Sequence, residues 1–193
     1  MKINNLTKKF NDKIIFDNYC CEILDNKINF IIGESGCGKT TLLRIIAGLD
    51  KLYQGTIEGL SEKIAVVFQE PRLIPYISVY KNIKIVNLTA DDEKITNLLR
   101  LVELENEGNS LPSSLSGGMK MRASIARALN YDSDIILMDE PFASLDEELK
   151  DRILPKIFNI LKNKTVVIIS HNLSDCEKYA DNIIDLNKNI LKE

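Results

Sequence analysis

Apolar residues occur along the chain in short blocks that have the length and composition of buried strands. The blocks are rich in Ile and Val and are separated by longer polar or mixed segments. Runs of this kind are typical of parallel strands that helices cover on both faces. We predict strands at Ile28–Ile32, Ile64–Phe68, Ile135–Met138, Val166–Ile169 and Ile183–Leu186.

Several of the segments between these runs carry apolar residues at the spacing of one helix face. Pro155 is expected to kink the longest of them, because proline cannot donate a helical hydrogen bond. Strands that alternate with helices indicate βα units with right-handed crossovers, and hence an α/β fold around a mostly parallel core sheet. The predicted helices are Thr40–Ala47, Asp91–Leu104, Gly118–Leu129 and Asp146–Leu161.

The N-terminal segment follows a different pattern. Between Ile3 and Glu22 two strand-like pieces flank Asn11–Asp12, which favours a small antiparallel β flank beside the parallel core. The chain has no internal repeat, low-complexity segment or linker rich in Pro, Gly and Ser. We therefore predict a single domain over residues 1–193.

Composition, net charge and the length of the apolar runs indicate what class of protein this is. The 193 residues are 45% hydrophobic and 27% charged, which is ordinary for a globular domain. The net charge of −3 argues against a generic nucleic-acid binder, whose surface is usually basic. The sequence has no apolar run of membrane-spanning length and no N-terminal signal peptide, so we expect a cytoplasmic protein.

A glycine-rich segment follows the first predicted parallel strand and opens a helix. It reads GESGCGKT and fits the phosphate-binding pattern G-x-x-x-x-G-K-[ST]. Its backbone N–H groups and the helix N-terminus can surround phosphate oxygens, Lys39 can reach the terminal phosphates, and the Thr40 hydroxyl can ligate Mg²⁺. The residues expected to contact nucleotide here are Gly33, Glu34, Ser35, Gly36, Cys37, Gly38, Lys39, Thr40 and Thr41.

Two acidic residues follow a second apolar strand. Asp139 and Glu140 come at the end of Ile135–Met138, which places them at the carboxyl edge of a parallel sheet, where α/β folds bind ligands. We expect Asp139 to act in the Mg²⁺ shell and Glu140 to polarise the attacking water. Phosphoryl transfer to water needs a positioned nucleophile and neutralised charge more than covalent chemistry.

A further motif identifies the family that the chain resembles. Leu115–Met119 reads LSGGM and opens the predicted helix before the Asp139–Glu140 strand. It resembles the LSGGQ signature of the ABC ATPases, with Met119 in place of the usual Gln. The resemblance runs from Ile3 to Asn187, nearly the whole chain, and other P-loop classes lack this signature.

The signature is also a second anion site. Ser116 is a plausible N-cap, and the free N–H groups at Gly117 and Gly118 can face phosphate. One nucleotide does not need two such sites far apart on one surface. A two-fold dimer would close the signature of one chain over the cradle of the other, as the resemblance implies.

Further roles follow from the resemblance alone. Gln69 is similar to the glutamine that senses Mg²⁺ and the attacking water, and His171 to the switch histidine at the γ-phosphate. Asp146, in Ser144–Asp146, is similar to the D-loop that links the two ATP sites. Phe10 lies where the family stacks an aromatic ring on adenine, and a core position is the alternative explanation for this residue.

The resemblance implies an ATP-hydrolysing subunit that works as a head-to-tail homodimer on the inner face of the cell membrane, with ATP and Mg²⁺ as cofactors. It also implies separate permease subunits, a solute-binding protein and a helical subdomain over approximately residues 71–130. The segment from Phe68 to Pro75, FQEPRLIP, resembles nitrate, sulfonate and taurine importers.

The ATPase of an ABC exporter is the alternative to that of an importer, and three further alternatives remain. DNA-repair and chromosome-structuring ATPases share the signature but carry long insertions, whereas about 75 residues separate Thr40 from Leu115 here. Ribosome-associated ABC proteins carry two ATPase units on one chain. A degenerate, non-hydrolysing module would not be expected to keep Lys39, Glu140 and His171 together.

Overall fold

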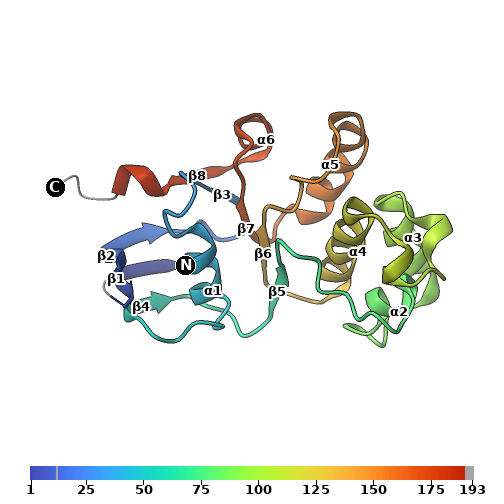
Figure 1. The fold of residues 1–193 in the computed structure, drawn as a ribbon, viewed down its shortest axis with the longest axis horizontal. Helices are drawn as coiled ribbons and strands as arrows, with labels where there is room; N and C mark the ends of the chain where they lie inside the picture. The colour runs from blue at the N-terminus through green and yellow to red at the C-terminus, as the bar shows by residue number, and fades with distance from the viewer. Residues whose placement is uncertain (12, 190–193) are drawn as a thin grey trace.

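The computed structural model describes residues 1–11 and 13–189 and shows a parallel sheet at the centre of the chain (Figure 1). Within this part of the chain the strand order is β5-β6-β7-β3-β8, and every neighbouring pair is parallel. This confirms the α/β prediction. The strands are β3 (Ile28–Ile32), β5 (Ile64–Val67), β6 (Ile135–Asp139), β7 (Thr165–Ile169) and β8 (Asn182–Asp185).

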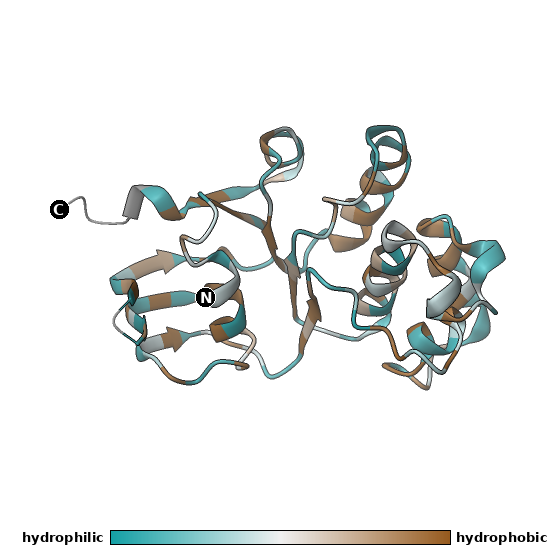
Figure 2. Ribbon diagram, viewed as in Figure 1, coloured by the Kyte–Doolittle hydropathy of each residue, from teal (hydrophilic) through white to brown (hydrophobic). Residues whose placement is uncertain are grey.

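Alternate residues of the central strands point into two hydrophobic clusters, one on each face of the sheet. Ile136 and Ile168 pack with the helices α4 and α5, whereas Leu137 and Val167 pack with α1 and the N-terminal strands. The strands therefore have few polar positions, and Figure 2 shows them as the most apolar part of the fold. This double coverage explains why their sequences read as continuous apolar runs.

Helices connect the strands, and three of them, α2, α3 and α4, lie together at one end of the molecule (Figure 1). These three fall within the range of the expected helical subdomain, whose separate status stays a prediction. The helices are α1 (Lys39–Ile46), α2 (Val79–Lys84), α3 (Asp92–Leu101), α4 (Gly117–Asn130), α5 (Glu147–Leu161) and α6 (Leu173–Tyr179), with 3₁₀ turns η1 (Glu105–Glu107), η2 (Pro112–Ser114) and η3 (Leu186–Asn189).

The N-terminal region forms the antiparallel flank that the sequence predicted. β1 (Lys2–Phe10) pairs with β2 (Lys13–Glu22) and with β4 (Gln54–Glu58), giving the order β2-β1-β4. The turn assigned to Asn11–Asp12 lies partly outside the described residues, because Asp12 is not among them. Asn11 has a φ of 51°, the left-handed conformation that asparagine tolerates in turns.

Some predicted boundaries were wrong, and local backbone geometry gives the reason. α3 ends at Leu101 rather than Leu104, because Glu103 adopts a left-handed φ of 53° that cannot continue a right-handed helix. α1 ends at Ile46, and the chain turns at Gly48 with a φ of 68°, as is common just beyond helix ends.

Other differences are smaller. β5 ends at Val67, one residue before Phe68, and Leu186 begins η3 instead of ending a strand. Asp139 is the last residue of β6 and not the first residue after it. Pro155 lies inside α5, and the helix continues past it to Leu161. No helix in residues 1–11 and 13–189 is long and apolar enough to cross a membrane.

Candidate active site

The glycine-rich segment forms a loop between β3 and α1, and Gly38 decides its shape. Gly38 is the N-cap of α1 and has a φ of 107°, which residues with a Cβ rarely adopt. An added Cβ there would lie 2.7 Å from Ile15 Cγ2 and 2.8 Å from Phe16 Cζ. Because Gly38 has no capping side chain, the first N–H groups of α1 remain available to an anion.

Lys39 folds back over this loop. Its Nζ donates hydrogen bonds to the carbonyl oxygens of Gly33 and Glu34, each at 2.8 Å, and the side chain is only 6% exposed. A buried ammonium needs partners, and here the loop itself supplies them. The positive charge is thus held beside the N-terminus of α1, where it adds to the attraction for phosphate.

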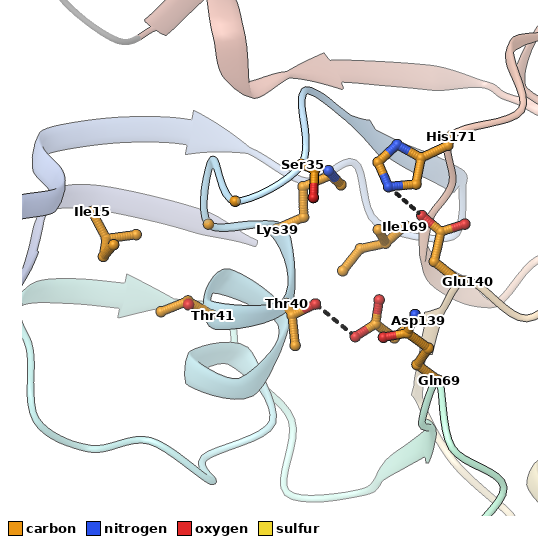
Figure 3. A pocket seen from close by; sticks show the side chains of 12 residues that line it. Ile15, Ser35, Lys39, Thr40, Thr41, Gln69, Asp139, Glu140, Ile169 and His171 are labelled. Atoms are coloured by element: carbon orange, nitrogen blue, oxygen red, sulfur yellow. Dashed lines mark hydrogen bonds and ion pairs between the residues drawn. The ribbon is translucent and has the colours of Figure 1, made fainter. Parts of the chain in front are cut away.

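Thr40 and Asp139 meet across the sheet edge. The Thr40 hydroxyl donates a hydrogen bond to Asp139 Oδ2 at 2.8 Å (Figure 3). Burial raises the pKa of Asp139, and the hydrogen bond from Thr40 partly offsets that shift. A buried carboxylate beside a hydroxyl is a pair of hard oxygen donors, which is the donor chemistry that Mg²⁺ takes.

Glu140 is the residue directly after β6, and an unusual backbone conformation aims it into the site. Its φ is 49°, and its N–H donates to the Ile169 carbonyl oxygen at 3.1 Å. Its Oε1 lies 3.1 Å from His171 Nε2, an ion-pair distance that does not meet hydrogen-bond geometry (Figure 3). Burial raises the pKa of Glu140, and His171 counteracts this. Left-handed non-glycine residues are enriched at functional sites.

These side chains share one pocket of about 240 Å³ at the carboxyl edge of the sheet. β5 brings Gln69, β6 brings Asp139 and Glu140, and β7 leads to His171 (Figure 3). The lining includes these predicted residues together with Ser35, Gly36, Gly38, Lys39, Thr40 and Thr41.

Sequence reasoning missed two residues that line the pocket, Ile15 and Ile169. Ile15 lies on β2 and packs over Gly38, a contact that depends on how the antiparallel sheet meets the loop. Ile169 is the last residue of β7 and precedes the Ser170–His171 pair. The position of Ile169 just before the predicted switch histidine was the one signal that could have revealed it.

Other predicted site residues are not among those that line this pocket. Gly33, Glu34 and Cys37 belong to the loop but are not among the lining residues. Asp146 caps α5, where its Oδ1 accepts a hydrogen bond from Leu149 N at 2.9 Å. Phe10 is 49% exposed at the end of β1 and is also outside the lining.

The signature segment caps α4, as predicted. Ser116 is the N-cap, and its Oγ accepts a hydrogen bond from Met119 N at 3.2 Å. A Cβ built on Gly117 has no described atom within 4 Å, whereas one on Gly118 would lie 3.2 Å from the Ser144 carbonyl oxygen. None of the described signature residues lines the pocket of its own chain.

Comparison with known proteins decides the family. A model of the ABC transporter family matches residues 16–143, which contain the phosphate loop, the signature and the Asp139–Glu140 pair. The chain belongs to the ABC transporter family. With its pocket assembled at the sheet edge, this ABC chain is an ATP-binding subunit and an ATPase.

Similar proteins agree with this assignment. The aliphatic sulfonates import ATP-binding protein SsuB 1 of Pseudomonas aeruginosa is 35% identical over 93% of this chain and 78% of its own length. An uncharacterized ABC transporter ATP-binding protein of Methanocaldococcus jannaschii is 36% identical, covering 96% and 77%. A dimeric ATP-binding cassette solved in a post-hydrolysis state with ADP and Pi has a TM-score of 0.81 and 29% identity, covering 95% of this ABC chain and 93% of that chain.

Proposed function

We propose that this ABC subunit hydrolyses ATP with Glu140 as general base and that His171 and Lys39 stabilise charge on the terminal phosphate. The observation that carries this proposal is the placement of Glu140 and His171, 3.1 Å apart at the end of adjacent parallel strands. The raised pKa of Glu140 brings its basicity closer to that needed to take a proton from water. Gln69, from the neighbouring strand, would orient the same water.

The donor set at Thr40 and Asp139 fits Mg²⁺. One hydroxyl and one buried carboxylate, 2.8 Å apart and next to Gln69, match a cation that is bound by one or two carboxylates and completes its shell with phosphate and water. When bound, the ion would neutralise phosphate charge. The described residues contain no cluster of three or more His, Cys, Asp or Glu side chains that could hold a metal without phosphate.

We further infer a head-to-tail homodimer in which the signature of one chain covers the cradle of the other. The cradle and the start of α4 are both anion sites, yet they do not share a pocket within one chain. A pocket of about 240 Å³ is also below the roughly 300–1,000 Å³ typical of small-molecule sites, so a nucleotide would extend out of it. A cassette similar to this chain was solved as a dimer in two structures.

The membrane partners would bind at the loop after Gln69. This loop carries two prolines and exposes apolar side chains, with Ile74 38% and Tyr76 89% exposed. Exposed apolar residues that gather in one place and are rimmed by polar ones mark protein interaction sites. We propose separate permease subunits and a solute-binding protein, with the ATPase on the inner face of the cell membrane. The similarity to sulfonate import subunits favours an importer of the nitrate, sulfonate and taurine type.

The Glu140→Gln variant tests the central proposal. We expect turnover, measured as phosphate release, to fall by about 10²- to 10⁴-fold, the usual contribution of a general base. ATP binding should persist, and the variant supplied with its membrane subunits should accumulate as a closed, ATP-loaded dimer. Glu177→Gln, on the exposed side of α6, is the matched control and should turn over normally. Normal turnover by Glu140→Gln would refute the role of this carboxylate.

A further inference from the structure

Lys8 is a buried cation outside the pocket. Its side chain is 3% exposed, and its Nζ lies 2.8 Å from each Asp50 carboxylate oxygen and donates to the Leu52 carbonyl oxygen at 2.8 Å. Lys8 in turn lowers the pKa of Asp50, mainly through this hydrogen bond. A buried ammonium is tolerated only with such partners, so the side chain is held in one place.

The same ammonium lies against the ring of Phe10. Lys8 Nζ is 4.6 Å from the ring centroid, within the range of a cation–π contact. The ring is nevertheless half-exposed at the end of β1. One face of the ring is therefore covered by a fixed charge, while the remaining ring surface is open to a ligand.

The partners of Lys8 belong to the turn that ends α1. Asp50 N donates to the Arg44 carbonyl oxygen at 3.2 Å, and Leu52 N donates to Asp50 Oδ1 at 3.0 Å. α1 begins at Lys39, inside the phosphate loop. Lys8 thus joins the Phe10 ring to the helix whose other end binds phosphate.

We propose that Lys8 is a positioning residue that fixes the Phe10 ring as a stacking platform for the nucleotide base, at a set place relative to the phosphate loop. This inference rests on the role of Phe10 in stacking on the base, which the family resemblance implies. A ring that is already immobilised pays less conformational entropy when the base binds. Stacking on a ring face is also possible without hydrogen bonds to the base, so the platform would add affinity for the base and none for phosphate.

Isothermal titration with Mg-ATP and with Mg-tripolyphosphate, which has no base, separates these contributions. The variants are Phe10→Leu, Lys8→Met and the combination of the two, with Lys9→Met as the matched control on the exposed side of β1. We expect Lys8→Met to weaken ATP binding by about 3- to 10-fold, the effect of releasing one ordered side chain, and to leave tripolyphosphate binding unchanged. In the Phe10→Leu background, Lys8→Met should have no further effect.

Folding is checked by thermal melting of each variant. Lys8→Met leaves the Asp50 carboxylate without its charged partner, so Lys8→Met combined with Asp50→Leu removes both charges and serves as the second variant. Lys8→Arg, which keeps the charge, should retain more ATP affinity than Lys8→Met.

Three results would overturn the proposal: an unchanged ATP affinity in both charge-removing variants, an equal loss for tripolyphosphate, or full additivity with Phe10→Leu. If Phe10→Leu itself leaves ATP affinity unchanged, the stacking role of Phe10 fails. If Phe10→Leu weakens ATP binding and the Lys8 variants do not, the positioning role alone fails.

Discussion

The N-termini of α1 and α4 are both formed by glycine-rich segments, but their surroundings differ. At α1 the same chain supplies a lysine, two carboxylates, a glutamine and a histidine around the free N–H groups. At α4 the Ser116 hydroxyl accepts a hydrogen bond from Met119 N, and the space beside Gly117 is open. The first site is assembled by the fold, whereas the second would need another molecule to become a site.

The two sites also differ in how much backbone strain and desolvation their own residues carry. The α1 site holds Asp139 and Glu140 with raised pKa values and a non-glycine residue at a φ of 49°. Such strain and desolvation reduce stability and are retained where function needs them. The α4 site has an ordinary N-cap and no comparable strain in the described residues. Substitutions should therefore separate the two sites by their effects on stability as well as on activity.

The largest effect on ATP binding is expected from Lys39→Ala, which removes the charge at the α1 site. Hydrogen bonds to a charged group contribute about 1.5–3 kcal/mol, so ATP affinity measured by titration should fall by about 10- to 100-fold. Lys51→Ala, an exposed lysine beyond α1, is the control. An unchanged affinity in Lys39→Ala would mean that the ammonium stays on its own loop carbonyls when nucleotide binds.

Mixing two inactive variants tests whether the α4 site acts across a dimer. Gly117→Val adds a side chain into open space, so it should leave the fold intact and block only what binds there. Lys39→Ala and Gly117→Val should each lose ATPase activity. In an equal mixture half of the dimers would contain one chain of each variant. Each mixed dimer would have one intact site out of two, formed by the cradle of the Gly117→Val chain and the signature of the Lys39→Ala chain. The mixture should therefore recover about a quarter of the wild-type rate. No recovery, with dimers present, would contradict the composite arrangement.

The pH dependence of Glu140 gives a smaller effect with a defined sign. Burial raises its pKa in the free protein, so as pH falls the base should protonate, and kcat/KM should decline, at a higher pH than for an ordinary glutamate. At neutral pH the folded, ATP-free protein must hold a desolvated charge that the unfolded chain holds in water. Glu140→Gln should therefore melt at a higher temperature than the wild type near pH 7.5.

The same linkage fixes how that stability difference changes with pH. It should shrink as pH falls toward about 4.3, the value of an unperturbed glutamate, because the wild-type carboxyl then folds in its neutral form. Melting curves across this range measure it. A difference that grows on acidification would contradict the raised pKa.

The smallest effect is expected at the N-cap of α4. Ser116→Ala should lower the free energy of unfolding by about 1 kcal/mol, because it leaves Met119 N without its acceptor. Ser116→Asn, which can also cap, should recover most of this stability in denaturant titrations. Loss of ATPase activity beyond that explained by stability would indicate that the hydroxyl also contacts nucleotide.

Much of the fold was predictable from the chain. The apolar runs gave the central strands because both faces are buried, and the strand–helix context of the phosphate loop held in the structure. The elements that were not predicted are short or mostly exposed. β4 has exposed or half-exposed residues throughout, and α2 and α6 are six and seven residues long, too short for a clear helical period.

The sequence by itself predicted the charged and polar residues that line the pocket, because a glycine-rich loop, an acidic strand end and a lone histidine after a strand have local signatures. The tertiary structure decided their arrangement. The order β5-β6-β7-β3-β8 brings the ends of strands far apart in the sequence to one edge, which no local pattern encodes. It also decided that Ile15 would line the pocket and that Lys8 would join Phe10 to α1, since these contacts arise where separate elements pack together.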